Sequence, residues 1–171
     1  MKTLKTFIIL LTVFVSFSSA KAQDKSATAA VNNVLTAYLD VKNALTADNT
    51  AATKTKAKDL VAAINVVPMD KLTADQHKAW MTYSEKLQFD SRHISESDAI
   101  DHQREHFTSL SKNMYELIKT LKLNTSTVYE QYCPMKKATW LSESNAVKNP
   151  YYGKQMLTCG KTTETLAPAA K

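Results

Sequence analysis

The sequence predicts a mainly α-helical protein, an antiparallel four-helix bundle with a small β-containing Cys/Met-rich subsite near its C-terminus. Three observations support this fold class. Four stretches between residues 29 and 122 repeat apolar residues at intervals of three and four, the spacing of amphipathic helices. The connections between them are short, which favours antiparallel neighbours. Both glycines and both cysteines lie beyond residue 132, where the helical pattern has ended.

The N-terminal segment has the pattern of an export signal. Two lysines precede an apolar run at residues 7–17, and residues 20–22 (Ala-Lys-Ala) have the small-x-small pattern that signal peptidase cleaves. We therefore expect residues 1–22 to be a signal peptide and Gln23 to begin the exported chain. The run is shorter than the about 20 residues of a transmembrane helix, so no membrane span is expected after cleavage. A retained N-terminal anchor is the alternative.

The chain without its signal has the size and charge of one ordinary domain, which we expect to cover residues 23–165. It has 19 basic and 16 acidic residues, a net charge of +3. Arginine is scarce and the lysines are scattered, so nothing resembles the basic stripe of a nucleic-acid-binding protein. Residues 162–171 form a polar tail with Ala and Pro, and we expect its last residues, 166–171, to be disordered.

The first two predicted helices precede a proline. The first runs from near Ala29 to between Ala44 and Ala47, and the second from Thr50 to about Asn65. Pro68 ends the second, because a residue that precedes proline is pushed out of the helical region. The buried stripes are expected to be Val31, Val34, Leu35, Tyr38, Val41 and Leu45 in the first helix, and Leu60, Ala63 and Ile64 in the second.

The third predicted helix opens at a capping box, in which Thr73 is followed three residues later by Gln76. A fourth long helix follows the possible cap at residues 95–98 and ends near Lys122. The pattern weakens at residues 89–95, and the sequence leaves open whether these two helices are continuous. Beyond them, residues 125–132 are β-branched and aromatic and predict a short strand, with a second at residues 138–141.

The C-terminal region, residues 127–160, places one thiol and one thioether in each of its halves. If residues 128–135 are extended, Cys133 and Met135 project from one face. If residues 154–159 are helical, Met156 and Cys159 are neighbours at i and i+3. Two thiolates with two thioethers make a sensible site for a soft ion, Cu(I) or Ag(I). Zinc fits less well, because it prefers Cys and His to thioether ligands.

The same two cysteines can instead form a disulfide, for which one intramolecular pairing exists. Export to an oxidising compartment favours this alternative. A Cys133–Cys159 bond would stabilise the fold by about 3–4 kcal/mol in the chain-entropy description, with the methionines as ordinary packing residues. The two states can also alternate, with the pair oxidised when metal-free and binding metal when reduced.

Other side chains of possible functional importance are aromatic residues and histidines. Trp140, Tyr151 and Tyr152 can wall the sulfur site, although aromatic residues near turns more often serve packing. His102 and His106 lie four residues apart on the fourth predicted helix and form a weaker second metal candidate, with Asp98 or Asp101 as a third ligand. No catalytic motif and no phosphate-binding glycine loop is present, so we do not expect an enzyme.

Several of these runs together resemble a known family. They are Tyr132-Cys133-Pro134-Met135, Trp140-Leu141-Ser142, Asn149-Pro150-Tyr151-Tyr152-Gly153, Met156-Leu157-x-Cys159-Gly160 and, upstream, Gln103-Arg104-x-x-Phe107-x-x-Leu110-Ser111. The chain resembles an exported bacterial family catalogued as domain of unknown function number 3347. The first run is also similar to the Tyr-x-Cys-Pro-Met-His motif of heavy-metal efflux adaptors. It lacks the residue between Tyr and Cys, and Lys136 stands in place of the His.

The resemblance implies a periplasmic location and a role in copper or silver handling, because members of the family also occur attached to efflux adaptor proteins. The sequence-based hypothesis is thus a Cu(I) or Ag(I) chaperone or buffer whose partner is such an adaptor or another metal-handling protein. The alternative hypothesis is a disulfide-stapled interaction module that binds no metal.

Overall fold

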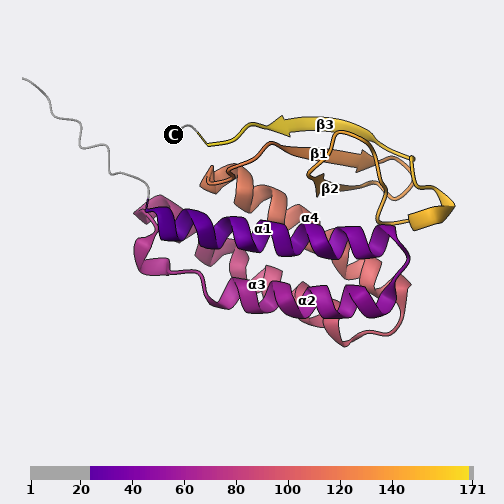
Figure 1. Ribbon diagram of the computed structural model, residues 1–171, viewed down its shortest axis with the longest axis horizontal. Helices are drawn as coiled ribbons and strands as arrows, with labels where there is room; N and C mark the ends of the chain where they lie inside the picture. The colour runs from indigo at the N-terminus through magenta and orange to yellow at the C-terminus, as the bar shows by residue number, and fades with distance from the viewer. Residues whose placement is uncertain (1–23, 170–171) are drawn as a thin grey trace, which may run out of the picture.

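The computed structural model describes residues 24–169, which form four α-helices followed by a three-stranded antiparallel sheet (Figure 1). The predicted signal peptide, residues 1–22, and the last residues of the predicted tail, 170–171, lie outside the described residues. The helices are α1 (Lys25–Thr46), α2 (Thr50–Asn65), α3 (Ala74–Glu96) and α4 (Ile100–Leu121). Within residues 24–169, no helix has the length and apolar character needed to cross a membrane.

Side-chain caps fix where three of the helices begin. Asp24 accepts a hydrogen bond from the Ser26 N–H at the start of α1, and Asn49 accepts one from the Ala52 N–H at the start of α2. The capping box predicted at Thr73 is confirmed, with both of its reciprocal hydrogen bonds formed. Each cap satisfies a backbone N–H that has no partner inside the helix.

Helices α3 and α4 are separate, which answers the question that the sequence left open. The break covers residues 97–99. Gln103, in the first turn of α4, forms side-chain hydrogen bonds that fix this connection. Its side-chain amide donates to Ser97 O at 2.8 Å and to Thr50 O at 3.2 Å. The buried Gln103 therefore joins the α3–α4 connection to the start of α2.

Consecutive helices pack against each other, α1 on α2, α2 on α3 and α3 on α4. The sheet lies over the side of the helices formed by α1 and α4, with strand β2 in contact with both (Figure 1). The apolar stripes predicted for the first two helices form part of the core, apart from the half-buried Ala63. Fully buried residues at its centre include Val34, Tyr38, Leu60, Leu87, Phe107, Leu110, Met114 and Leu117.

Tyr38 of α1 joins the helices to the sheet. Its ring stacks on Phe107 of α4 with centroids 5.4 Å apart. Its hydroxyl lies 2.8 Å from Ser111 Oγ and accepts a hydrogen bond from the Leu141 N–H of β2 at 3.0 Å. Burial raises the pKa of this phenol far above its usual value, so it stays neutral.

The sheet has the order β2-β1-β3, with strands β1 (Val128–Cys133), β2 (Ala138–Ser142) and β3 (Lys161–Leu166). The first two strands were predicted. The third was not, because residues 162–171 were assigned to a polar tail. Burial alternates between exposed and half-buried along β3, so no apolar face marked it as a strand. Its pairing with β1 is a tertiary interaction, which local sequence does not encode.

A β-bulge interrupts the pairing of β1 with β3. Glu130 pairs with Glu164 and Gln131 pairs with Thr162, so Thr163 is left without a partner across the strand pair. The Thr163 hydroxyl donates to the Glu130 side chain at 2.7 Å and lies 3.2 Å from Glu130 O. The bulge shifts the register of the remaining pairs by one residue.

We expect Tyr38→Phe to lower the free energy of unfolding by about 1–3 kcal/mol, because it leaves the buried Leu141 N–H without an acceptor. Urea denaturation measures this loss. The matched control is Tyr83→Phe, whose hydroxyl has no hydrogen bond among the described residues and whose change should stay within about 0.5 kcal/mol. Equal stability of the two variants would contradict the role assigned to Tyr38.

Candidate functional site

The pairing of β1 with β3 brings the two cysteines together. Cys133 is the last residue of β1, and Cys159 lies two residues before β3. Tyr132 pairs with Lys161, so the next position, Cys133, falls opposite Gly160 and diagonally across from Cys159. Both are free thiols. The pKa of Cys159 is raised above its usual value, mainly by partial burial and to a smaller extent by the neighbouring Cys133 thiol.

The two thiols differ in exposure. Cys133 is completely buried, and its Sγ accepts a hydrogen bond from the Lys136 N–H at 3.4 Å. Cys159 is half-buried, its N–H donates to Met156 O at 3.0 Å, and its carbonyl accepts from the Asn149 side chain at 2.7 Å. The pair therefore has one sulfur in the protein interior and one that solvent can reach.

The two methionines lie in turns, which corrects two expectations from the sequence. Strand β1 ends at Cys133, and Met135 lies in the turn to β2 with 63% of its surface exposed. Residues 154–159 are not a helix. A single 3₁₀ turn, η2 (Gly153–Gln155), precedes Met156, which has φ −143° and is 37% exposed. Strand alternation and helical spacing therefore do not place either thioether beside a thiol.

Trp140 and Tyr151, two of the three predicted wall residues, are buried, and Tyr152 is half-buried. The Trp140 and Tyr151 rings meet edge to face with centroids 6.0 Å apart. A Cβ on Gly160 would lie 2.9 Å from Trp140 Cη2 and 3.0 Å from Tyr132 O. Glycine at position 160 is therefore required by close packing beside the thiols, as well as by its φ of +155°.

The turn at residues 149–154 is fixed by the side chain and the backbone N–H of Asn149. Asn149 accepts a hydrogen bond from the Tyr151 N–H at 2.8 Å, and its backbone N–H donates to Leu157 O at 2.7 Å. Together with its bond to Cys159 O, these contacts make Asn149 the link between the turn and the segment that carries Cys159. Its side chain is completely buried.

Arg104 of α4 connects this turn to the helices. Its Nε donates to Pro150 O at 2.9 Å, and its Nη2 donates to Leu45 O at 3.2 Å and to the Asp48 carboxylate. Asp48 lies in the α1–α2 connection with φ 58° and accepts a hydrogen bond from the Lys154 N–H at 3.0 Å. A Cβ on Gly153 would lie 1.9 Å from Asp48 Oδ1, so only glycine fits there.

The upstream motif noted in the sequence is the buried face of α4. Its five named residues, Gln103, Arg104, Phe107, Leu110 and Ser111, are all buried. Gln103 closes the α3–α4 connection, Arg104 holds the turn near Cys159, and Ser111 bonds to Tyr38. These residues therefore support the packing of the helices against the C-terminal region.

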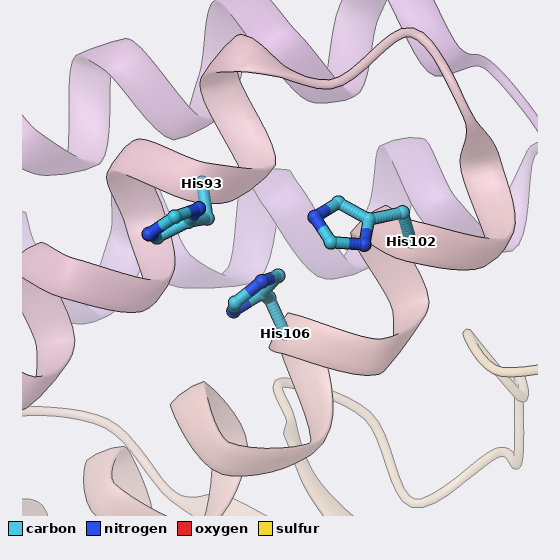
Figure 2. Close-up of side chains that lie close together, drawn as sticks. All are labelled: His93, His102 and His106. Atoms are coloured by element: carbon cyan, nitrogen blue, oxygen red, sulfur yellow. The ribbon is translucent and has the colours of Figure 1, made fainter.

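His102 and His106 lie together as their spacing predicted, with ring centroids 4.7 Å apart (Figure 2). With His93 of α3 they form a group of three histidines that could hold a metal ion. The sequence suggested no partner for His93. Neither Asp98 nor Asp101 belongs to the group, and Asp98 instead pairs with Lys54 at 2.6 Å. His93 was missed because only the packing of α3 against α4 brings it near.

The family described as protein of unknown function (DUF3347) matches residues 34–126, more than half of the chain. The chain belongs to this family. The matched segment covers most of α1, all of α2 to α4 and the start of the link to β1, and it ends before both cysteines. Comparisons with the curated proteins and with the solved structures found no match.

We expect Asp48→Asn to lower the free energy of unfolding by about 1–3 kcal/mol at pH 7, because Arg104 and the Lys154 N–H lose a charged acceptor. Asparagine tolerates positive φ, so the backbone should be unchanged. The Lys154 N–H and Arg104 hold the pKa of Asp48 below its usual value. The stability that this carboxylate contributes is thus present above about pH 4 and lost as the pH falls through its folded pKa.

The difference between wild type and Asp48→Asn should therefore shrink in acid, which urea denaturation at pH 7 and pH 3 would measure. Asp70→Asn is the control, because Asp70 is exposed and, among residues 24–169, its ion pair is with the neighbouring Lys71 alone. Its effect should stay within about 0.5 kcal/mol at either pH. A loss for Asp48→Asn that does not depend on pH would argue against an ionic role.

Proposed function

We propose that the protein binds a soft monovalent ion, Cu(I) or Ag(I), through Cys133 and Cys159. The observation that carries the proposal is the convergence of two free thiols at the end of one strand pair. Thiolates are the protein ligands that such ions prefer. One ligand comes from the buried end of β1 and the other from the half-exposed segment before β3, so an ion can enter from the side of Cys159.

Met135 and Met156 would be neutral ligands that complete the coordination of the ion or take part in its transfer to a partner. Each lies in a turn within three residues of one cysteine in the sequence, and each side chain is exposed. A flexible thioether at the surface can swing toward a bound ion without disturbing the core. Trp140 and Tyr151 would shield the ion from water on the buried side. Tyr152 would complete this wall.

Metal binding would have to displace the thiol protons, because the thiolate is the ligand. The raised pKa of Cys159 makes this thiol protonated near neutral pH, so the metal must compete with its proton. A site that binds its ion against this competition can release it on transfer.

The wider role that we propose is metal handling in the periplasm after removal of the signal peptide, with the helices as an antiparallel bundle that supports the site. The partner would be an efflux adaptor or another metal-handling protein. No catalytic role is proposed. The alternative is an interaction module stapled by a Cys133–Cys159 disulfide, which the same closeness of the thiols would favour under oxidation.

Native mass spectrometry of the chain beginning at Gln23, prepared without reductant and given one equivalent of Cu(I) without oxygen, separates these functions. A one-copper adduct on the dithiol chain is the expected result. A metal-free mass that is two hydrogen atoms lighter would support the disulfide module instead, and the search for a function would move to partners of the helical surface.

Single substitutions assign the ligands. Cys133→Ser should abolish tight Cu(I) binding, because it removes a thiolate at almost unchanged size, while Met135→Ala should only weaken it. Met81→Ala is a matched control, since Met81 is half-exposed on α3 and belongs to neither turn. Competition with a Cu(I) chelator measures the affinities. Binding of equal strength by wild type and all three variants would rule out the sulfur site.

A further inference from the structure

A second group of possible metal ligands lies between α3 and α4, on elements that carry neither cysteine. Its members are His93 of α3 and His102 and His106 of α4 (Figure 2). One ring nitrogen from each histidine lies within 4.8 Å of the other two. His93 and His106 lie face to face, with centroids 4.6 Å apart and planes at 8°. We propose that these histidines bind a divalent transition-metal ion of the borderline class, such as Zn²⁺.

The orientation of His106 is fixed by the buried carboxylate of Asp90. Asp90 Oδ1 lies 3.1 Å from His106 Nδ1. In the tautomer that donates the Nδ1–H to this carboxylate, the lone pair of Nε2 is left for a metal. Metal-binding histidines in proteins usually donate their second ring nitrogen to such a carboxylate. Asp90 is 4% exposed and also supplies negative charge close to the cation.

The ring nitrogens are close enough for four-coordinate zinc after side-chain movement. The stacked rings of His93 and His106 must also rotate, because imidazole lone pairs lie in the ring plane and parallel rings do not point at one ion. Zinc–nitrogen bonds of about 2.0–2.1 Å hold the nitrogens of a tetrahedral site about 3.3 Å apart. The required approach is about 1.5 Å or less for any pair. His102 can supply much of it, because its side chain is 48% exposed and its partner Glu105, 3.7 Å away, lies at the surface.

Three histidines leave one position of a tetrahedral ion for water or an exchangeable ligand. Phe89 covers part of the group, with its ring centroid 4.4 Å from that of His93 and 5.9 Å from that of His106. It is nevertheless 57% exposed, which is unusual for a phenylalanine. An apolar side chain over the histidines would limit the access of water to a bound ion.

This site would differ in class from the sulfur site. Imidazole nitrogens suit Zn²⁺ and Cu²⁺, whereas thiolates and thioethers suit Cu(I) and Ag(I). The histidine site therefore does not depend on the proposed function and can be tested with both cysteines removed. The competing explanation is that the three rings only pack α3 against α4.

The test is a Zn²⁺ titration by calorimetry of untagged Cys133→Ser/Cys159→Ser protein. We expect one Zn²⁺ per chain. His93→Gln and His102→Gln should each reduce the affinity at least tenfold, and Asp90→Asn should reduce it by roughly ten- to a hundredfold. His77→Gln is the matched control, because His77 is exposed on α3 and outside the group, and its affinity should be unchanged.

A Co²⁺ spectrum of the protein with both cysteines present gives a second measurement that does not need the double variant to fold. Nitrogen ligands should produce visible ligand-field bands without a thiolate charge-transfer band, and His102→Gln should remove them. Absence of Zn²⁺ binding by folded protein would overturn the proposal. So would equal affinities of His102→Gln and His77→Gln, or Co²⁺ ligand-field bands that His102→Gln leaves unchanged.

Discussion

The guanidinium of Arg104 is the interaction on which the C-terminal region depends. It lies almost entirely out of solvent and donates to Pro150 O, Leu45 O and the Asp48 carboxylate. Pro150 lies in the turn before Cys159, Leu45 lies near the end of α1, and Asp48 lies in the connection between α1 and α2. A buried charge with fewer partners would be strongly unfavourable, so the three segments are held together by the need to satisfy it. The site near the cysteines is thus built on the helices rather than appended to them.

The helices were predictable because their signals are local. Capping residues, one proline and three-four spacing are all contained within a few turns of chain, and the predicted limits of α2 agree with the structure. Strand β3 and the position of His93 were not predictable, since each depends on a neighbour distant in sequence. The sequence singled out the segments that carry the two cysteines, and the pairing of β1 with β3 brings these segments together. Strand alternation predicted the position of Met135 and helical spacing predicted that of Met156, but both methionines lie in turns.

The two candidate metal sites differ in how the fold supplies their ligands. The cysteines come from a strand end and a loop, held in place by backbone pairing and by Asn149. The histidines come from two helices that pack directly against each other, with Asp90 beneath them. The sulfur pair can therefore separate by local opening of the sheet, while the backbone positions of His93 and the two histidines of α4 can separate only if the helices themselves part.

The β-bulge at Thr163 has a consequence for the thiol pair. Continued without interruption from the Glu130–Glu164 pair, the ladder would set Cys133 opposite Lys161 and move Cys159 a further residue away. The unpaired threonine shortens that separation, and its hydroxyl keeps the irregularity in place by bonding to Glu130. Thr163, an exposed residue outside the thiol pair, thus sets how far apart the two cysteines lie along the paired strands. A deletion or insertion in this solvent-facing strand would act on the chemistry of the cysteines as directly as a substitution beside them.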